Sequence, residues 1–320
     1  MLKKLTPLEE KKFIGCIGAI NIDRSYKCYQ SFNMGDSNIA NLTQSVGGVM
    51  FNITSTLNNL SHKVDLISFL GDDIESIIVK EYLTQIGINT SNIFTIKNQK
   101  TGTYTVILDK QGEIIIGVND MSIIEKIKIN NFEEKLNKIN ANTWVIDSNF
   151  KENSLEKIVS LLKNKNLIAT AVSKYKAPRL KPALKFLDYL FLNEDELFAL
   201  TPKEKNLRNA IDSILKFGTK NIFVTLGSNG AIAANSNNFI QESVFPTKVV
   251  DLNGTGDAFC GAAISYIKKN MPLIDILKYG LASSSLLAEV SGSTRKDLNH
   301  NLSKFFVGSV AGTVNGFGTL

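Results

Sequence analysis

The sequence is poor in cysteine, histidine and tryptophan, and this scarcity excludes several kinds of site. Its 320 residues include one Trp, three cysteines (Cys16, Cys28 and Cys260) and two histidines (His62 and His300). Three cysteines without paired spacing argue against a disulfide framework and against a zinc site. Two histidines are too few for a His-rich metal site, and we do not expect a His-based triad. Acid and base chemistry must therefore fall to carboxylates.

Long apolar runs and basic stripes are also missing. Phe13 to Ile20 is too short to cross a membrane and lacks the cleavage pattern of a signal peptide. The net charge of +6 comes from scattered Lys and Arg, without the interleaved aromatic residues typical of nucleic-acid binding. We therefore expect a cytoplasmic protein that binds small molecules and neither a membrane nor a nucleic acid.

Alternating apolar segments predict an α/β protein. A chain of this length with 43% hydrophobic residues can bury one large α/β core. Apolar runs at 13–20 and 64–70 predict buried strands. Beyond residue 143, predicted strands alternate with predicted helices, which is typical of a parallel sheet with right-handed crossovers. The predicted strands of this second part are 143–147, 167–171, 189–192 and 222–226, and the predicted helices include 155–162 and 274–290.

Two segments near the N-terminal third predict a second, smaller sheet. The β-rich runs 103–108 and 113–118 are joined by Asp-Lys-Gln-Gly, a hairpin pattern. An earlier polar segment, 25–45, interrupts the strand and helix pattern in the same way. Together they predict a small sheet that stands apart from the main one.

A glycine-rich loop, Asp251 to Gly261, leads from an apolar segment into a predicted buried helix. The first turn of a helix carries N–H groups without internal partners and the positive end of the helix dipole, so it attracts anions. Gly254 and Gly256 allow the backbone to approach a phosphate closely. Asp257 follows at the start of the helix, where it could cap the helix or act as a general base on an attacking alcohol. In the second case the loop amides would stabilise the transferred phosphoryl group.

The run Gly254-Thr255-Gly256-Asp257 resembles the Gly-Ala-Gly-Asp signature of the ribokinase-like (PfkB) carbohydrate and nucleoside kinases, in which the Asp is the catalytic base. The resemblance extends over roughly residues 13–306. It implies a three-layer α/β/α sandwich with a mostly parallel central sheet and a small β-sheet lid. We expect one kinase domain over 1–307, a lid formed by about 24–46 and 93–119, and a flexible tail at 308–320.

The resemblance also implies a set of site residues, ATP as phosphoryl donor, Mg²⁺, and a monovalent cation such as K⁺. Glu196 would organise Mg²⁺ through water, although Asn193 and Glu196 fit a helix-capping box equally well. Thr255 lies with Gly254, Gly256 and Asp257 in the catalytic loop. The implied acceptor-binding residues are Asn21, Asp23, Gly47, Gly48 and Asn52, and the implied nucleotide-binding residues are Asn193, Thr225, Gly227, Gly230 and Ser285.

Within this family, four islands are most similar to pseudouridine kinases. They are Asp36-Ser37-Asn38, Gly47-Gly48-Val49 with Asn52, Asn119-Asp120-Met121 and Asp147-Ser148-Asn149. This resemblance implies ATP-dependent phosphorylation of the 5′-hydroxyl of pseudouridine, with Asn38 and Asn119 reading the ring and Asn149 in the acceptor site. It also implies a homodimer that pairs through the lid.

The sequence departs from the family pattern at several places and leaves alternatives open. In the phosphate loop, Asn253 and Thr255 replace the common Thr and Ala. Ile39-Ala40 replaces a Pro-Gly, Met50-Phe51 replaces a Gly-Arg, and Ala171-Val172 replaces an Asp-Pro. A kinase for ribose, another nucleoside or a related sugar shares every core motif. A member of the family that only binds its ligands is a further alternative, which the intact loop from Gly254 to Asp257 disfavours. No Gly-x-Gly-x-x-Gly follows the first strand, which disfavours a dinucleotide-dependent oxidoreductase.

Overall fold

The computed structural model describes residues 13–129 and 132–314, and its centre is a nine-stranded sheet. The order is β13-β12-β11-β10-β9-β8-β1-β4-β5. The strands from β5 to β11 are parallel, and β12 and β13 are antiparallel additions at one edge. The predicted α/β fold with a mostly parallel sheet is therefore confirmed. The strands are β1 (Phe13–Ile17), β4 (Val64–Leu70), β5 (Ile93–Thr95), β8 (Ala141–Asp147), β9 (Asn166–Thr170), β10 (Tyr189–Asn193), β11 (Asn221–Thr225), β12 (Ala231–Asn235) and β13 (Phe239–Glu242).

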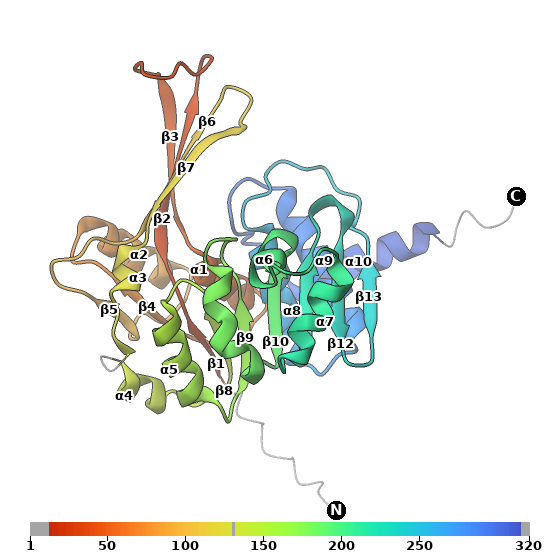
Figure 1. Cartoon of the computed structure of the whole chain (residues 1–320). Helices are drawn as coiled ribbons and strands as arrows, with labels where there is room; N and C mark the ends of the chain where they lie inside the picture. Colours follow the sequence, from red (N-terminus) through yellow and green to blue (C-terminus); the bar gives the residue numbers. More distant parts are fainter. Residues whose placement is uncertain (1–12, 130–131, 315–320) are drawn as a thin grey trace, which may run out of the picture.

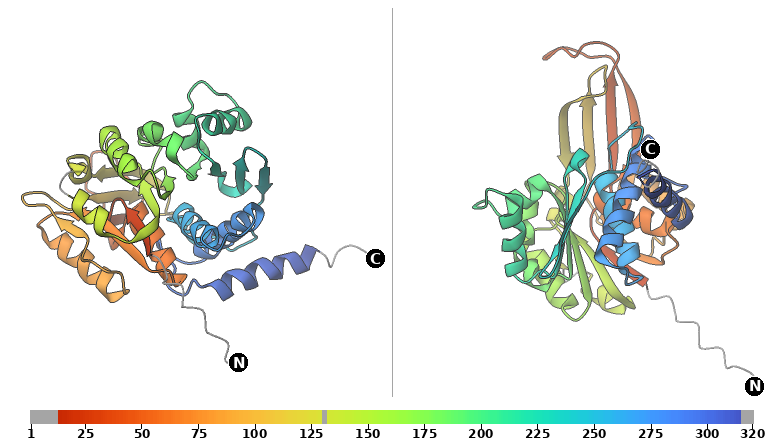
Figure 2. Two further views of the ribbon diagram at one scale, coloured as in Figure 1. Left: turned by 90° about the horizontal axis from the view of Figure 1, so that it is seen from below. Right: turned by 90° about the vertical axis from the view of Figure 1, so that its right-hand side faces the viewer.

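Helices cover both faces of this sheet and give the molecule three layers (Figure 2). Side chains alternate between two hydrophobic cores, as a pleated strand requires: in β1, Cys16 belongs to one and Ile17 to the other. One face carries α3 (Ser122–Glu125), α4 (Glu133–Lys138), α5 (Glu152–Leu162), η2 (Ala177–Phe186), α6 (Glu194–Leu200) and α7 (Leu207–Lys216). The other carries α1 (Val49–Asn59), α2 (Ile74–Gln85), α8 (Thr255–Ile267) and α9 (Leu273–Ala288), with α10 (His300–Val314) packed on α9.

A second, four-stranded sheet projects from the body of the molecule (Figure 1). Its order is β3-β2-β6-β7, and it confirms the predicted small sheet, which is called the lid below. The strand β2 pairs antiparallel with β3 and parallel with β6, and β6 and β7 form the predicted hairpin. The lid strands are β2 (Asn21–Cys28), β3 (Ala40–Gly47), β6 (Thr103–Leu108) and β7 (Ile114–Asp120).

Three boundaries differ from the prediction. The first strand ends at Ile17, and Asn21 already begins the lid strand β2. Residues 93–95, expected in the lid, form β5 and pair with β4 in the large sheet. The predicted tail at 308–320 begins inside α10, which continues to Val314, while its last residues lie outside the described ranges.

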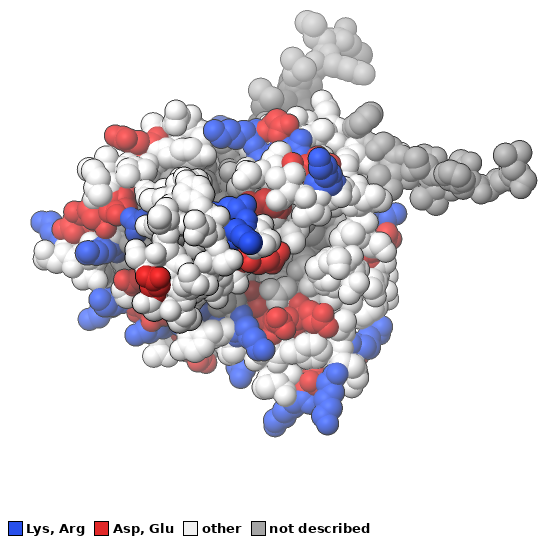
Figure 3. Space-filling model, turned by 90° about the horizontal axis from the view of Figure 1, so that it is seen from above, with Lys and Arg blue, Asp and Glu red and all other residues white. Residues whose placement is uncertain are grey.

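Two surface properties bear on possible partners. Within the described ranges, no helix combines the length and apolar character needed to cross a membrane. On the face seen in Figure 3, Lys and Arg side chains are interspersed with Asp and Glu.

Candidate active site

The glycine-rich loop ends at the first turn of α8. Gly254 precedes the helix with a φ of 74°, and a Cβ there would lie 2.4 Å from the Ser293 carbonyl oxygen, so only glycine fits. The first bond within the helix runs from the Ala258 N–H to the Gly254 carbonyl at 2.9 Å. The amides of Gly256 and Asp257 precede that bond, and no atom lies within 4 Å of a Cβ built on Gly256. This turn therefore offers backbone donors to an open space, as an anion site requires.

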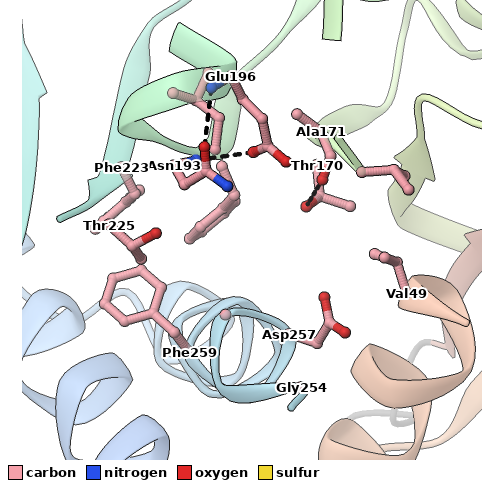
Figure 4. A pocket seen from close by; sticks show the side chains of 14 residues that line it. Val49, Thr170, Ala171, Asn193, Glu196, Phe223, Thr225, Gly254, Asp257 and Phe259 are labelled. Carbon is pink, nitrogen blue, oxygen red and sulfur yellow. Dashed lines mark hydrogen bonds between the residues drawn. The ribbon is translucent and has the colours of Figure 1, made fainter. Parts of the chain in front are cut away.

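Asp257 projects from this turn into the pocket (Figure 4). Its Oδ2 accepts a hydrogen bond from Asn52 Nδ2 of α1 at 2.7 Å. The pKa of Asp257 is raised to about 7, mainly by burial and also by the nearby carboxylates of Glu196, Asp147 and Asp23, while the hydrogen bond from Asn52 opposes the shift. A carboxylate with this pKa can accept a proton efficiently near neutral pH.

Asn52 lies between Asp257 and the start of the lid. Its side chain is buried, and its Oδ1 has no hydrogen-bond partner among the described residues. Buried amide oxygens are rarely left unpaired in folded proteins, so this atom points to a ligand that completes the site.

The acceptor residues implied by the resemblance gather where β1 turns into the lid. Asn21 Nδ2 donates to Asp23 Oδ1 at 2.5 Å, and burial raises the pKa of Asp23 to about 6. Asn21 pairs with Gly47 across β2 and β3, and a Cβ on Gly47 would lie 2.0 Å from Asp23 Oδ2. Gly48 has a φ of 102°, and a Cβ built on it would lie 2.6 Å from the Ala19 carbonyl oxygen. The structure thus brings these four residues together, directly before α1 and Asn52.

The pocket beside Asp257 is lined by strand ends, by α6 and by Val49 of α1, and the acceptor residues Asn21, Asp23, Gly47, Gly48 and Asn52 lie outside its lining. Asn193 and Glu196 face the cavity from the start of α6, and Thr225 faces it from the end of β11 (Figure 4). Sequence reasoning missed the phenylalanines Phe191, Phe223 and Phe259, which also line it. Each lies in an ordinary apolar run, so no pattern distinguished a lining residue from a core residue.

Asn193 and Glu196 do form the capping box. Asn193 Oδ1 accepts from the Glu196 N–H at 2.9 Å, and Glu196 Oε2 accepts from the Asn193 N–H at 2.8 Å. The capping box uses Oε2 of Glu196 and leaves Oε1 toward the cavity, so capping does not exclude contact between Glu196 and a ligand. Burial also raises the pKa of Glu196.

A magnesium ion fits this wall only through water. In the described part of the chain, no group of three or more His, Cys, Asp and Glu side chains could hold a metal ion. Mg²⁺ usually keeps several waters and takes one or two carboxylates together with substrate phosphates. The single free oxygen of Glu196 suits such a site.

Asn149, predicted to bind the acceptor, lies in a buried network beside the turn between β1 and β2. Its N–H and Nδ2 donate to Asp147 at 2.9 and 3.0 Å, and its Oδ1 accepts from Lys176 Nζ at 2.7 Å. Asp147 Oδ2 accepts from the Ala19 N–H at 2.8 Å. The amide of Asn149 therefore supports the turn that presents Asn21, and it does not line the pocket.

Three residues predicted to bind the nucleotide lie behind the wall of the pocket. Gly227 and Gly230, with φ of 57° and 91°, form the turn after β11, and a Cβ on Gly230 would lie 1.9 Å from the Glu242 carbonyl. Ser285 donates from α9 to the Phe245 carbonyl at 3.3 Å. These residues position Thr225 and the loop before α8 without lining the pocket.

The two lid residues predicted to read a base differ in their surroundings. Asn38 lies in the loop between β2 and β3, where its Oδ1 accepts from the Asn33 N–H at 2.8 Å and its Nδ2 donates to the Asn33 and Asp36 carbonyls. Its amide is thus used within the loop. Asn119 of β7 is exposed and lies opposite Tyr104, which in turn lies opposite Asp23.

Comparison with known sequences identifies the family. Residues 11–300 match the pfkB family carbohydrate kinase. Among curated proteins, the pseudouridine kinase of Escherichia coli (strain K12) is 24% identical over 298 residues, which cover 91% of this chain and 95% of that protein.

Solved structures share the fold. The structure of Arabidopsis thaliana ribokinase complexed with ribose and ATP has a TM-score of 0.82 at 21% identity, covering 92% of this chain and 98% of the other. A protein from E. coli assigned as a ribokinase II, in complex with ATP and Mg²⁺, has a TM-score of 0.77 at 19% identity, with 93% and 99% covered. These likenesses confirm the ribokinase-like architecture.

Proposed function

The chain belongs to the pfkB family of carbohydrate kinases, and from that premise we propose that it transfers a phosphoryl group from ATP to the 5′-hydroxyl of pseudouridine. Membership makes it a phosphotransferase that acts on an alcohol of a sugar or nucleoside. The choice of pseudouridine is supported by the four sequence islands and by the similarity to the E. coli pseudouridine kinase.

One contact carries the proposal: Asn52 Nδ2 lies 2.7 Å from Asp257 Oδ2, joining the acceptor side of the cleft to the proposed base. Asp257 accepts the proton of the 5′-hydroxyl while that oxygen attacks the γ-phosphorus and ADP leaves. The unpaired Oδ1 of Asn52 and the carboxylate of Asp23 accept hydrogen bonds from ribose hydroxyls, which holds the nucleophile in place. The amides of Gly256 and Asp257 stabilise charge on the phosphoryl group as it is transferred.

Two cations belong to the proposal. When bound near Glu196, Mg²⁺ supplies positive charge that neutralises the donor phosphates. The requirement for a monovalent cation remains a prediction, and activity in K⁺ compared with Na⁺ at equal ionic strength tests it. A kinase that uses ATP as donor fits the cytoplasm, where we place the protein.

A kinase for ribose or another nucleoside is the second candidate. The ribokinase of Dictyostelium discoideum is 28% identical over 275 residues, and the amide of Asn38 is occupied within its own loop. Both observations favour an acceptor that is recognised mainly through its sugar.

An acceptor panel with the Asp257→Asn variant tests the function. We expect ATP consumption with pseudouridine to exceed that with uridine, ribose and fructose. Asp257→Asn should lower kcat on the order of a hundredfold or more, because it removes the base. Its melting temperature should not fall, since the amide oxygen still accepts from Asn52.

Activity near the wild-type level in Asp257→Asn would exclude the proposed base. A wild-type chain that prefers ribose would replace pseudouridine with the second candidate.

We also propose that two copies pair through the lid. The lid face opposite Asp23 carries a row of apolar side chains, Leu42, Tyr26, Ile107 and Ile116, with Val118 in the next row. Ile116 is 48% exposed and Val118 is 59% exposed. Exposed apolar clusters of this kind mark interaction surfaces.

A further inference from the structure

One row across the lid contains both the proposed sugar anchor and an aromatic side chain. Strand pairing places Ser45, Asp23, Tyr104 and Asn119 directly opposite one another on β3, β2, β6 and β7. Residues that lie opposite in neighbouring strands project from the same face of a sheet. Tyr104 therefore projects from the same face as Asp23, one strand away.

That face is the one turned toward the catalytic cleft. Asn21 and Gly47 project from the same face as Asp23, and Gly47 packs against Asp23. A Cβ on Gly48, which leads into α1 and Asn52, would lie 2.7 Å from Asn21 Oδ1. On the opposite face, Arg24 pairs with Glu75 of α2 at 2.7 Å.

The surroundings of Tyr104 leave its ring available to a ligand. The side chain is 37% exposed, although it lies opposite the half-buried Asp23. Its hydroxyl would lie 2.8 Å from a Cβ on Gly117, so the ring extends over a glycine of β7 and no side chain there covers it. A flat aromatic face beside a carboxylate is what a nucleoside needs, because its base can stack while its ribose bonds to the carboxylate.

The position of Tyr104 relative to Asp23 also suits the dimensions of a ribonucleoside. When Asp23 holds the hydroxyls on C2′ and C3′, the base on the adjacent C1′ extends about one strand spacing to the side, roughly 4.8 Å. The strands that flank β2 are β3, with Ser45 opposite Asp23, and β6, with Tyr104 opposite Asp23. Of these two residues, only Tyr104 offers an aromatic face, and Asn119 of β7 follows it in the row.

We propose that Tyr104 determines specificity by stacking on the base of the acceptor, so that this kinase favours nucleosides over free sugars. The inference rests on the proposed function and adds a residue to it. Asn119, next in the row, is placed to bond the edge of the stacked base.

The test compares kcat/KM for pseudouridine and for ribose in three variants. Tyr104→Ala should lower kcat/KM for pseudouridine roughly 10- to 100-fold, the loss typical of one base stack, and change the value for ribose little. Tyr104→Phe should keep most of the nucleoside activity. Tyr104→Leu keeps apolar bulk without a π-face and serves as the second variant if Tyr104→Ala does not fold.

Tyr29→Ala is the control. Tyr29 is 66% exposed and directly follows β2 of the same lid, outside both the proposed acceptor row and the proposed pairing row. The ratio of the two kcat/KM values should stay at its wild-type level in this variant.

Two outcomes overturn the inference and separate it from the proposed function. An equal loss for both acceptors in Tyr104→Ala and Tyr104→Leu, or no loss in either variant, removes the stacking role while nucleoside phosphorylation by the wild type stands. A wild-type chain that phosphorylates free sugars and no nucleoside removes both.

Discussion

At the scale of single residues, Asp257 differs from a surface carboxylate because it is buried and because three other carboxylates act on its charge. Burial and the charges of Glu196, Asp147 and Asp23 raise its pKa to about 7, while Asn52 opposes the shift. The pKa of Asp23 is raised to about 6, mainly by burial. Both groups must be ionised to play their proposed roles, so both pKa values limit activity on the acid side.

The pH profile of kcat/KM should show this. The value should fall about tenfold per unit as pH drops below 7, because Asp257 takes up a proton, and more steeply below 6, where Asp23 follows. Asn52→Ala removes a donor that stabilises the carboxylate, so its acid limb should move to higher pH. A profile that stays flat down to pH 5 would contradict the assignment of Asp257 as the base.

The contribution of Asp257 and Asp23 to folding stability should change with pH in the direction opposite to activity. Both pKa values are higher in the folded chain than in the unfolded chain, so the folded state binds more protons between about pH 4 and 7. These two groups therefore contribute stability at low pH that is lost as pH rises toward 7. Melting temperatures of the wild type and Asp257→Asn, compared across this window, separate this contribution from acid denaturation of the rest of the chain.

The sequence could single out candidate site residues that occupy a fixed place in a motif, and their roles remain predictions. Gly254, Gly47 and Gly48 stand in recognisable glycine motifs, and in the structure a Cβ at each would meet neighbouring atoms. Asn38 and Asn149 show the limit, since only coordinates reveal that their amides already have partners. Tyr104 could not be found, because an aromatic residue in a β-rich run is ordinary and its neighbours come from distant segments.

At the scale of elements, the start of α8 contains two glycines with different tasks. Gly254 needs a positive φ and lies against the Ser293 carbonyl, whereas Gly256 has open space at its Cβ position. The first glycine therefore serves the fold, and we propose that the second leaves space for the phosphate of a ligand.

Alanine substitutions should separate these tasks. Gly254→Ala should lower the free energy of unfolding by at least about 1 kcal/mol, because the new Cβ is strained in the left-handed region and meets Ser293. Gly256→Ala should leave the free energy of unfolding equal or higher by up to about 1 kcal/mol, since alanine favours a helix, and should still lower kcat/KM. Urea unfolding and steady-state kinetics measure the two effects. Wild-type kinetics in Gly256→Ala would show that no phosphate approaches this turn.

The elements themselves were largely predictable, and the misplaced boundaries have physical causes. The apolar run 13–20 looked like one strand because the turn that follows β1 is itself buried: Gly18 packs against Asp147, and Ala19 donates to it. Burial therefore continued past the end of the strand. β5 consists of only three residues, Ile93–Thr95, too few for a pattern to show which sheet they join.

At the scale of the whole molecule, the lid has one polar and one apolar face. One face carries Asn21, Asp23 and Asn119. The other face is covered at its base, where Ile22 is buried and Arg24 pairs with Glu75 of α2, and farther out it exposes the apolar side chains Tyr26, Leu42, Ile116 and Val118. Alternation along each strand produces this division, and the sequence showed it only in part because β2 and β3 are rich in polar residues on both faces.

We predict that Ile116→Asp converts a dimer into a monomer, because a charge would be buried at the centre of the apolar face. Sedimentation velocity or light scattering measures the change in mass. Phe217→Asp, at an exposed position after α7 and away from the lid, is the control and should remain dimeric. A monomeric wild type, or an unaltered mass for Ile116→Asp, would refute pairing through this face.

The path of the chain from the lid into the body has a mechanical consequence. β3 passes through Gly47 and Gly48 directly into α1, without an intervening loop, and α1 carries the partner of Asp257. We therefore expect any movement of the lid on acceptor binding to shift Asn52, and with it the surroundings of the Asp257 carboxylate.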